Sequence, residues 1–473
     1  MKHFSVNLPV PAMNLPVQLC VRTNMMKQME VKCKSKIEMK GKKLLLSVSM
    51  LLAVSSLFAQ QVDLTLQRAI EIALAENPTI HVADKDIELK KVASTEAWQS
   101  LLPSVDGSLA LSHSIKVAEM RTSMGTFKMG MDGSTTAQGG ITVALPLFAP
   151  AVYQNMKLTK EDILLAQEKA RGSRLDLINQ VTKAYYGAML SSDSYEVMKK
   201  SYEVAQQNYN VVEQKFNVGK VSEYDKISAE VQMRSMNSSM VSAESGKELA
   251  LLQLKVLMGI NPEIEVAIAD DLKSYEGKLA LSDSQYDAAE LDNNSALRQL
   301  DQNASLLQRT RKILSTNFMP TVAMQLQGQY QSMSNDNWNV FKYKYSPSLT
   351  LAFNVSVPIY HASNFTKLKS NKLQQEQLGD TRLNTYRQLN MAAESYRKNM
   401  ASNLAQVESN AEAVKQADKA VNISSKRYEV GRGTILELNQ SETALTQAEL
   451  TYMQSIYNYL VNKADLDYTL GRE

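Results

Sequence analysis

The chain carries an internal duplication, and this feature limits its possible folds more than any other. The turn Phe216-Asn217-Val218-Gly219 recurs 212 positions later as Tyr428-Glu429-Val430-Gly431. At a spacing of 217 positions, Asn77 is matched by Asn294. Repeats of this length indicate two structurally equivalent halves, which need not be independent domains.

The first 59 residues have the features of a leader. Lysines 40, 42 and 43 precede a mostly apolar run, Leu44 to Ala59, which fits a secretory signal peptide cleaved near Ala59 and is short for a membrane helix. Met39 is a candidate start. The only cysteines, Cys20 and Cys33, lie in this leader, so we expect a mature chain without disulfides or thiol chemistry. The full chain has a net charge of +3, but the chain without the leader has a negative net charge. A negative net charge gives no support to nucleic-acid binding.

Long proline-free stretches follow the leader and predict long helices. Prolines are absent between Pro150 and Pro262 and again after Pro358, and both stretches are rich in residues that helices tolerate. The repeated turn divides each stretch into a long and a short arm. The expected long helices are 151–218, 220–258, 359–430 and 432–470. We expect shorter helices at 79–102 and 295–319, stacked end to end with the short arms, because a long arm of roughly 100 Å exceeds a short one of about 60 Å.

A coiled-coil seam runs along the long arms. Apolar residues recur there at spacings of three and four, which makes helices supercoil around a narrow stripe. In the first half these residues are Tyr202, Ala205, Tyr209, Val212 and Phe216. Their repeat partners are Val414, Ala417, Val421, Ser424 and Tyr428. The remaining faces are polar, as in helices that meet water on two sides.

Four strands are expected between the helices, at about 104–115, 139–148, 322–331 and 348–360. The last strand alternates clearly, with Leu351 and Val355 on an apolar face and Asn354 and Ser356 on a polar one. Such alternation is typical of transmembrane barrel strands around a wet lumen. An ordinary sheet packed on helices would alternate in the same way, but the helices offer no separate core for it.

The expected fold is mainly α with a transmembrane β-barrel part and an internal two-fold repeat. Four strands cannot close a barrel in lipid, because open edges leave backbone groups unsatisfied. Three chains would give a shared twelve-stranded barrel, and the resemblance described next implies that the long coiled-coil helices form a periplasmic α-barrel. The expected segments are a leader at 1–59, a first repeat at 60–260, a linker at 261–293 and a second repeat at 294–473.

The chain resembles the TolC-like outer-membrane efflux proteins over about residues 62–471. The resemblance rests on the opening segment from Leu64 to Pro78, on the two repeated turns, and on their order relative to the duplicated strand pairs. It implies a homotrimer in outer-membrane lipid, a periplasmic adaptor protein, and an inner-membrane pump of the RND or ABC type. It therefore implies a passive exit duct of a tripartite efflux or secretion system.

The same resemblance implies positions for a gate and a docking surface. Asp225 and Tyr428 match the family's gate network, whereas its arginine is replaced by Gly433, beside Arg432. The two aspartates at the family's narrowest point correspond to Glu437 and Gln440, so one charged ring is kept. Such a ring favours cations. Alternatively, Glu437 is simply an exposed residue near a helix cap. The turn residues expected to dock the adaptor are Val218, Gly219, Val430 and Gly431.

Other chemistry finds little support in the sequence. Outside the leader, His81, His113 and His361 form no zinc-protease pattern, and no phosphate loop or nucleophile elbow occurs, so we expect neither an enzyme nor a cofactor. Four methionines in one loop could suit a soft metal, but methionine is common throughout the chain and loop filling explains them better. They are Met120, Met124, Met129 and Met131. The alternative function is a periplasmic coiled-coil adaptor or scaffold without its own barrel.

Overall fold

The structure, a computed structural model, describes residues 62–472 apart from 124, 129–130, 281–285 and 336–338. The leader expected at 1–59 lies outside these residues, as do Met124 and Met129. The chain divides into Met1–Val62 and a second unit, Asp63–Glu473, which contains the helices and the main sheet. None of the described helices is both long and apolar enough to cross a membrane.

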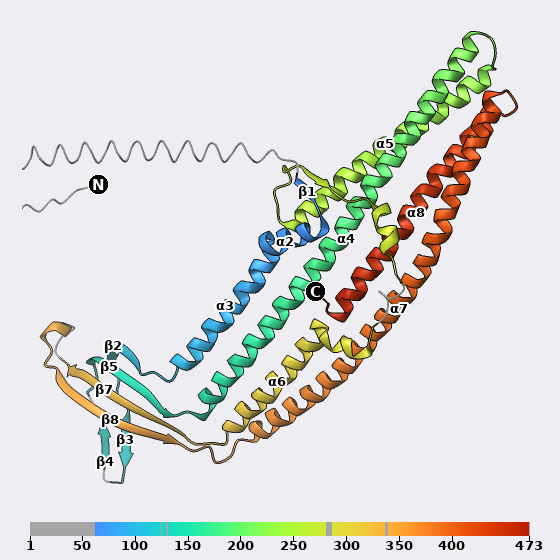
Figure 1. Ribbon diagram of the computed structural model, residues 1–473. Helices are drawn as coiled ribbons and strands as arrows, with labels where there is room; N and C mark the ends of the chain where they lie inside the picture. The colour runs from blue at the N-terminus through green and yellow to red at the C-terminus, as the bar shows by residue number, and fades with distance from the viewer. Residues whose placement is uncertain (1–61, 124, 129–130, 281–285, 336–338, 473) are drawn as a thin grey trace, which may run out of the picture. The chain divides into compact units, whose positions relative to one another are not determined.

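The long helices of the two halves are equal in length. Helices α4 (Pro150–Asn217) and α7 (Ala362–Glu429) each have 68 residues. Helices α5 (Glu223–Met258) and α8 (Ile435–Leu470) each have 36 residues and fold back along α4 and α7 as two helical hairpins (Figure 1). These helices confirm the four arms expected from the proline-free stretches, with boundaries that differ by a few residues.

The short helices continue the line of α5 and α8, as expected. Helix α2 (Leu66–Glu76) leads into α3 (Pro78–Gln99), and α6 (Ser295–Thr316) is the equivalent of α3 in the second half. Asn77 caps α3 and donates from Nδ2 to the Leu257 carbonyl at 2.7 Å. Asn294 caps α6 and donates in the same way to the Thr469 carbonyl at 2.8 Å. The duplicated asparagine therefore joins each short helix to the end of the neighbouring hairpin.

Two glycines make this end-to-end joint possible. Gly259 and Gly471 end α5 and α8 with φ of +73° and +67°. A side-chain carbon at Gly259 would lie 2.8 Å from the Glu76 carbonyl oxygen, and one at Gly471 would lie 2.5 Å from that of Asn293. Both the left-handed backbone and the close approach therefore require glycine.

The main sheet has four antiparallel strands in the order β2-β5-β7-β8. They are β2 (Ser104–Ser114), β5 (Ser134–Phe148), β7 (Thr321–Ser334) and β8 (Ser346–Ser356). The register pairs Leu326 with Leu351 and Gln327 with Thr350, so apolar and polar rows alternate across the strands. This alternation confirms the two-faced sheet expected from the sequence. Each of the four strands is joined to a helix, and all four joints lie at the same end of the strands (Figure 1).

Several strand boundaries differ from the expected ones: β5 begins at Ser134 and not at 139, β7 ends at Ser334 and not at 331, and β8 begins at Ser346 and not at 348. The last strand ends at Ser356 and not at Tyr360, because Pro358 has no N–H to donate to a ladder. The loop between the first two strands contains a hairpin that was not expected, formed by β3 (Glu119–Thr122) and β4 (Gly125–Lys128). Its four-residue strands are too short for a recognisable alternation.

A hydrophobic core lies where the segment after α5 covers α4 and α8. This segment contains β6 (Val266–Ile268), which pairs with β1 (Val62–Leu64), and the 3-10 helices η2 (Leu272–Lys278) and η4 (Ala288–Asn293). The fully buried Tyr185 donates from its hydroxyl to the Leu64 carbonyl at 2.9 Å and to Asp270 at 3.1 Å. The core is larger than the narrow seams suggested, because the expected linker contributes Leu272 and Leu291 to it.

Candidate gate and docking tips

The two repeated turns form the tips of the hairpins. Gly219 and Gly431 have φ of +73° and +71°, which confirms that both turns need a left-handed residue. At the first tip the N–H groups of Gly219 and Lys220 donate to the carbonyls of Phe216 and Lys215, which ends α4. Val218 and Val430 are each 68% exposed. The tips thus present matching apolar side chains to their surroundings.

Asp225 belongs to the cap of α5. Its carboxylate accepts from the Ser222 N–H at 3.1 Å and from the Ser222 hydroxyl at 2.7 Å. In return the Asp225 N–H donates to the Ser222 hydroxyl at 3.2 Å, which completes a capping box. Asp225 therefore fixes the start of α5 and lies directly behind the first tip.

Tyr428 lies between the two tips. Its ring packs on a small cluster of buried residues that joins the hairpins, formed by Val212, Ala229, Ile435 and Leu438. Its hydroxyl oxygen is buried and has no hydrogen-bond partner among the described residues. Burial and, second, the Asp225 carboxylate raise the pKa of the Tyr428 phenol. The Lys215 ammonium lies 4.7 Å from the ring centre. The structure therefore brings Asp225 and Tyr428 into one neighbourhood without a direct bond.

Glu437 lies in the first turn of α8, where Thr434 caps the helix by accepting from the Glu437 N–H at 3.2 Å. The Glu437 carboxylate is partly exposed and lies 3.6 Å from Arg427 Nη2. Gln440, one turn later, is exposed. The two side chains expected at the constriction therefore share one exposed face of α8.

Arg427 is the charged residue at this tip that the sequence reasoning missed. It pairs with Glu437 and also donates to the Arg432 carbonyl at 3.3 Å. Arg432, which was expected to help close the gate, is exposed and contacts Arg427 through its backbone: its carbonyl accepts from the Arg427 guanidinium, and its N–H donates to the Arg427 carbonyl at 2.8 Å. The last turn of α7 lies opposite the first turn of α8 across the tip, and this antiparallel placement was the available signal for Arg427.

A polar seam holds the two hairpins together further from the tips. Asn208 on α4 donates to the Glu442 carboxylate on α8 at 2.7 Å, and the hydroxyls of Ser201 and Thr446 are 2.7 Å apart. Gln232 on α5 donates to Thr443 at 3.2 Å. Burial raises the pKa of Glu442, and the bond from Asn208 opposes this effect. The hydrophobic spacing of the arms predicted contact here but not its polar character.

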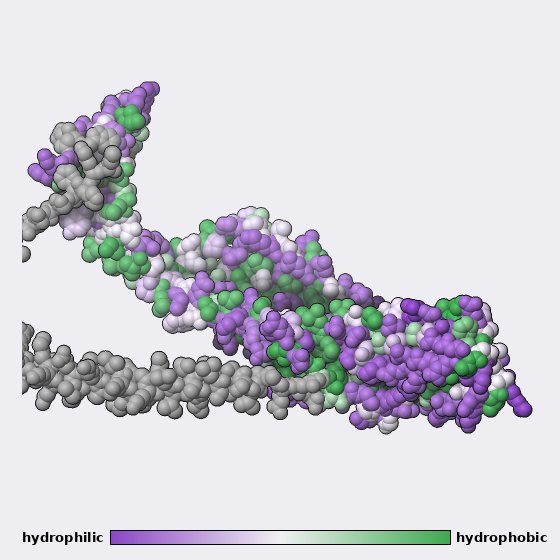
Figure 2. Space-filling model, turned by 90° about the horizontal axis from the view of Figure 1, so that it is seen from above, coloured by the Kyte–Doolittle hydropathy of each residue, from purple (hydrophilic) through white to green (hydrophobic). Residues whose placement is uncertain are grey.

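The seam borders a cavity of about 190 Å³ between the hairpins, lined partly by Val204, Met236 and Leu445. The helical part shown in Figure 2 is mainly hydrophilic, with hydrophobic side chains scattered among polar ones. Contacts between the hairpins at this level are therefore a mixture of hydrogen bonds and small apolar patches.

The described residues contain no cluster of side chains typical of a metal site. Across the described ranges, no three histidine, cysteine, aspartate or glutamate side chains are grouped as ligands. Met120 and Met131 are exposed, whereas Met124 and Met129 lie outside the described residues. The methionine loop thus gives no described ligand set.

Known proteins resemble the chain in sequence and in fold. The family model for outer membrane efflux proteins matches residues 69–260 and 288–472. The alkaline protease secretion protein AprF of Pseudomonas aeruginosa is 21% identical over 409 residues, which cover 85% of this chain and 83% of that protein. The outer membrane protein TolC of Vibrio cholerae is 19% identical over 72% of this chain and 77% of its own.

A solved structure shows the same fold. The CmeC outer membrane channel of Campylobacter jejuni superimposes with a TM-score of 0.67 at 17% identity, covering 86% of this chain and 85% of that one. The four strands of each chain accordingly contribute to a shared twelve-stranded barrel in the outer membrane, and the helices form its periplasmic extension. The chain belongs to the outer membrane efflux protein family, whose members are the outer-membrane exit ducts of tripartite efflux and secretion systems.

Proposed function

We propose that the hairpin tips close the periplasmic end of this duct and dock its adaptor. Channels of this family work as trimers with an adaptor and an inner-membrane pump. Three copies place six tips around one axis, with Val218 and Val430 as apolar contacts for the adaptor. The pump is of the RND or ABC type, and the duct itself is passive and not an enzyme.

The exposed Glu437 carboxylate carries the gate assignment. Its neighbour Arg427 is 3.6 Å away and partly exposed, so this pair is weak and leaves the carboxylate largely uncompensated. Three such carboxylates near an axis repel one another and attract cations. Gln440 adds a neutral ring about one helical turn away. The closed end of the duct is therefore a single acidic ring.

Cation block of the reconstituted trimer tests this assignment. We expect millimolar multivalent cations, added on the periplasmic side, to reduce single-channel current. Glu437→Gln should weaken the block at least tenfold, because it removes one full charge from each subunit. Gln440→Asp should strengthen the block by adding a second acidic ring. Conductance histograms at several cation concentrations provide the measurement.

Glu412→Gln is the matched control. Glu412 on α7 is also partly exposed and also lies 3.6 Å from a cation, Lys415. Its loss removes the same charge from the same hairpin but not from the first turn of α8. Equal weakening of the block by both variants, or an unchanged block in Glu437→Gln, would place the constriction elsewhere.

A further inference from the structure

Small residues interrupt the apolar face of the barrel sheet at mid-height. One row across the strands reads Gly107, Ile141, Gly328, Leu349, and the next reads Leu109, Gly139, Tyr330, Pro347. The row nearer the helices, from Val105 to Leu351, contains only large apolar side chains. The glycines of three adjacent strands therefore leave a depression between large neighbours.

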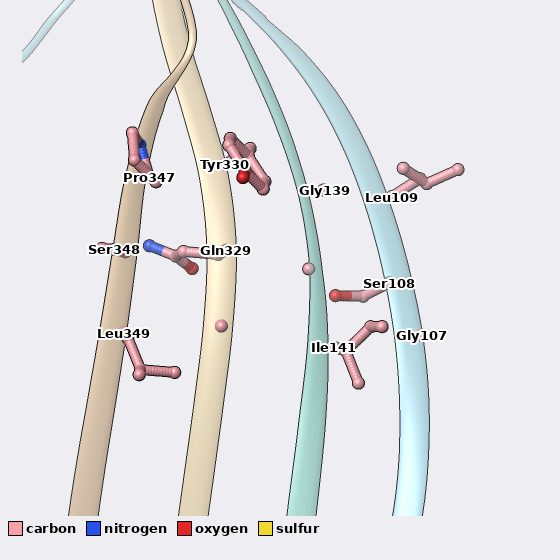
Figure 3. A pocket seen from close by; sticks show the side chains of 12 residues that line it. Gly107, Ser108, Leu109, Gly139, Ile141, Gln329, Tyr330, Pro347, Ser348 and Leu349 are labelled. Atoms are coloured by element: carbon pink, nitrogen blue, oxygen red, sulfur yellow. The ribbon is translucent and has the colours of Figure 1, made fainter.

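This depression is a groove of about 1000 Å³. Figure 3 shows Leu109, Ile141, Tyr330 and Leu349 around it, one from each of the four strands. Towards the strand ends remote from the helices, a second hollow of about 720 Å³ shares Leu109, Gly139 and Tyr330 with the first. The two hollows adjoin along the sheet and are lined mostly by apolar groups, and we call them together the glycine groove.

The outer end of the glycine groove is bordered by the loop between β7 and β8. Val340 and Tyr345 line the second hollow, and the Tyr345 hydroxyl donates to the Val340 carbonyl at 2.9 Å. Phe341 beside them is 95% exposed, as expected of an aromatic residue at a membrane–water interface. The same short segment carries two exposed lysines, Lys342 and Lys344.

The orientation of the barrel determines which part of the membrane the glycine groove contacts. The helices are periplasmic and join the strands at one end. The β7–β8 loop lies at the opposite end of the strands and therefore at the outer surface of the membrane. Apolar rows face lipid in such a barrel, whereas polar rows face the lumen. The glycine groove therefore opens into the outer leaflet, with its basic end at the headgroups.

We propose that the glycine groove binds an anionic, phosphate-bearing lipid of the outer leaflet. The inference rests on the barrel position of these strands. A hydrocarbon chain fills the space that the glycines leave, because every side chain of the outward-facing rows that line it is apolar except the Tyr330 hydroxyl. Lys342 and Lys344 meet the phosphate, since an ammonium attracts it as a point charge. Each trimer has three equivalent grooves.

Lipid retention by the purified, full-length trimer tests the proposal. Delipidated trimers are titrated with phosphatidylglycerol or with phosphatidylcholine of the same acyl chains, and native mass spectrometry counts the bound lipids. We expect up to three tightly held phosphatidylglycerols. Gly107→Leu combined with Gly328→Leu should lower their retention at least fivefold. Both sites accept a side chain, because a Cβ at Gly107 has nothing within 4 Å and one at Gly328 has only Leu349 at 3.6 Å.

Two matched controls separate the groove from general effects. Val355→Leu adds apolar volume to the same face outside the groove and should leave retention unchanged. Lys342→Gln with Lys344→Gln should reduce retention of phosphatidylglycerol but not of phosphatidylcholine, whereas Lys116→Gln in the other outer loop should change neither.

Three outcomes would overturn the proposal. Unchanged retention after filling the groove would show that lipid binds elsewhere. An undiminished preference for phosphatidylglycerol over phosphatidylcholine after the lysine changes would show that Lys342 and Lys344 do not bind the phosphate. Loss of the trimer on filling would mean that a second copy of the chain occupies the groove. Conductance in planar bilayers is recorded for each variant, so failure of the lipid site is distinguished from failure of the duct.

Discussion

At the scale of single residues, the structure of the hairpin tips depends on a few charged and polar side chains that make different contacts. Asp225 is held by its helix cap, whereas the Tyr428 hydroxyl is buried and has no bond among the described residues. Arg427 contacts both sides of the second tip, because its guanidinium lies beside Glu437 and donates to the Arg432 carbonyl. Arg432 stays a predicted gate residue, and we assign a second charged tie to Arg427.

This assignment predicts a difference between two neighbouring arginines. Arg427→Ala should raise the resting conductance of reconstituted trimers about twofold, because it removes a weak, exposed contact to Glu437. Arg432→Ala should change conductance much less, since the bond from Arg427 uses the backbone carbonyl and survives the substitution. Single-channel recording compares them, and a larger effect of Arg432→Ala would show that the closed state uses contacts beyond one chain.

At the scale of elements, the seam between the hairpins contains a carboxylate whose burial favours its protonated form. A raised pKa means that the packed seam binds a proton more readily than the separated hairpins do. Ionised Glu442 therefore weakens the seam at neutral pH. The seam strengthens as the pH falls through this raised value towards the ordinary one of 4.5.

Mild acidification should accordingly lower the resting conductance. Between pH 7 and pH 4.5 we expect the wild-type trimer to close further, because protonated Glu442 no longer opposes contact between α4 and α8. Glu442→Gln should be closed equally well at both pH values. Glu412→Gln, which alters an exposed carboxylate, should retain the wild-type response. A pH response that persists in Glu442→Gln would assign it to another group.

The turns make a second prediction at this scale. Gly219→Val and Gly431→Val should each abolish export while trimers still assemble, because a branched side chain resists the left-handed backbone at the tip but no neighbour lies within 4 Å to be displaced. Drug or protein export from cells and trimer content of the outer membrane are measured together. Loss of trimers would mean that the turns serve folding and not docking.

At the scale of the whole molecule, regular features of the sequence predicted the architecture. Proline-free stretches predicted α4, α5, α7 and α8, and strict alternation predicted the strands, because each signal extends over many residues. The core around Tyr185 was not predicted, since the segment after α5 has short elements without a period. The seam at Glu442 was missed because Asn208 and Glu442 lie on helices that are distant in sequence. Arg427 was missed although Glu437 is close to it in sequence, because their contact depends on the shape of the turn between α7 and α8.

The position of the sheet in the membrane leads to the last prediction. Leu351 and Val355 pair with Leu326 and Val322 on the apolar face, whereas Asn354 pairs with Ala323 on the polar one. Single cysteines at Leu351 and Val355 should therefore resist a membrane-impermeant thiol reagent in whole outer membranes, because lipid covers them. A cysteine at Asn354 should react at least tenfold faster, since water fills the lumen.

No other thiol is expected to interfere with this labelling, because Cys20 and Cys33 lie in the expected leader. Cysteine at Thr350 gives a second lumen-facing position in the same strand, and its paired residue Gln327 is also polar. Labelling should return at Leu351 and Val355 once detergent replaces the bilayer and the protein is unfolded. Equal labelling of both faces in intact membranes would contradict the barrel and favour a sheet that meets water on both sides.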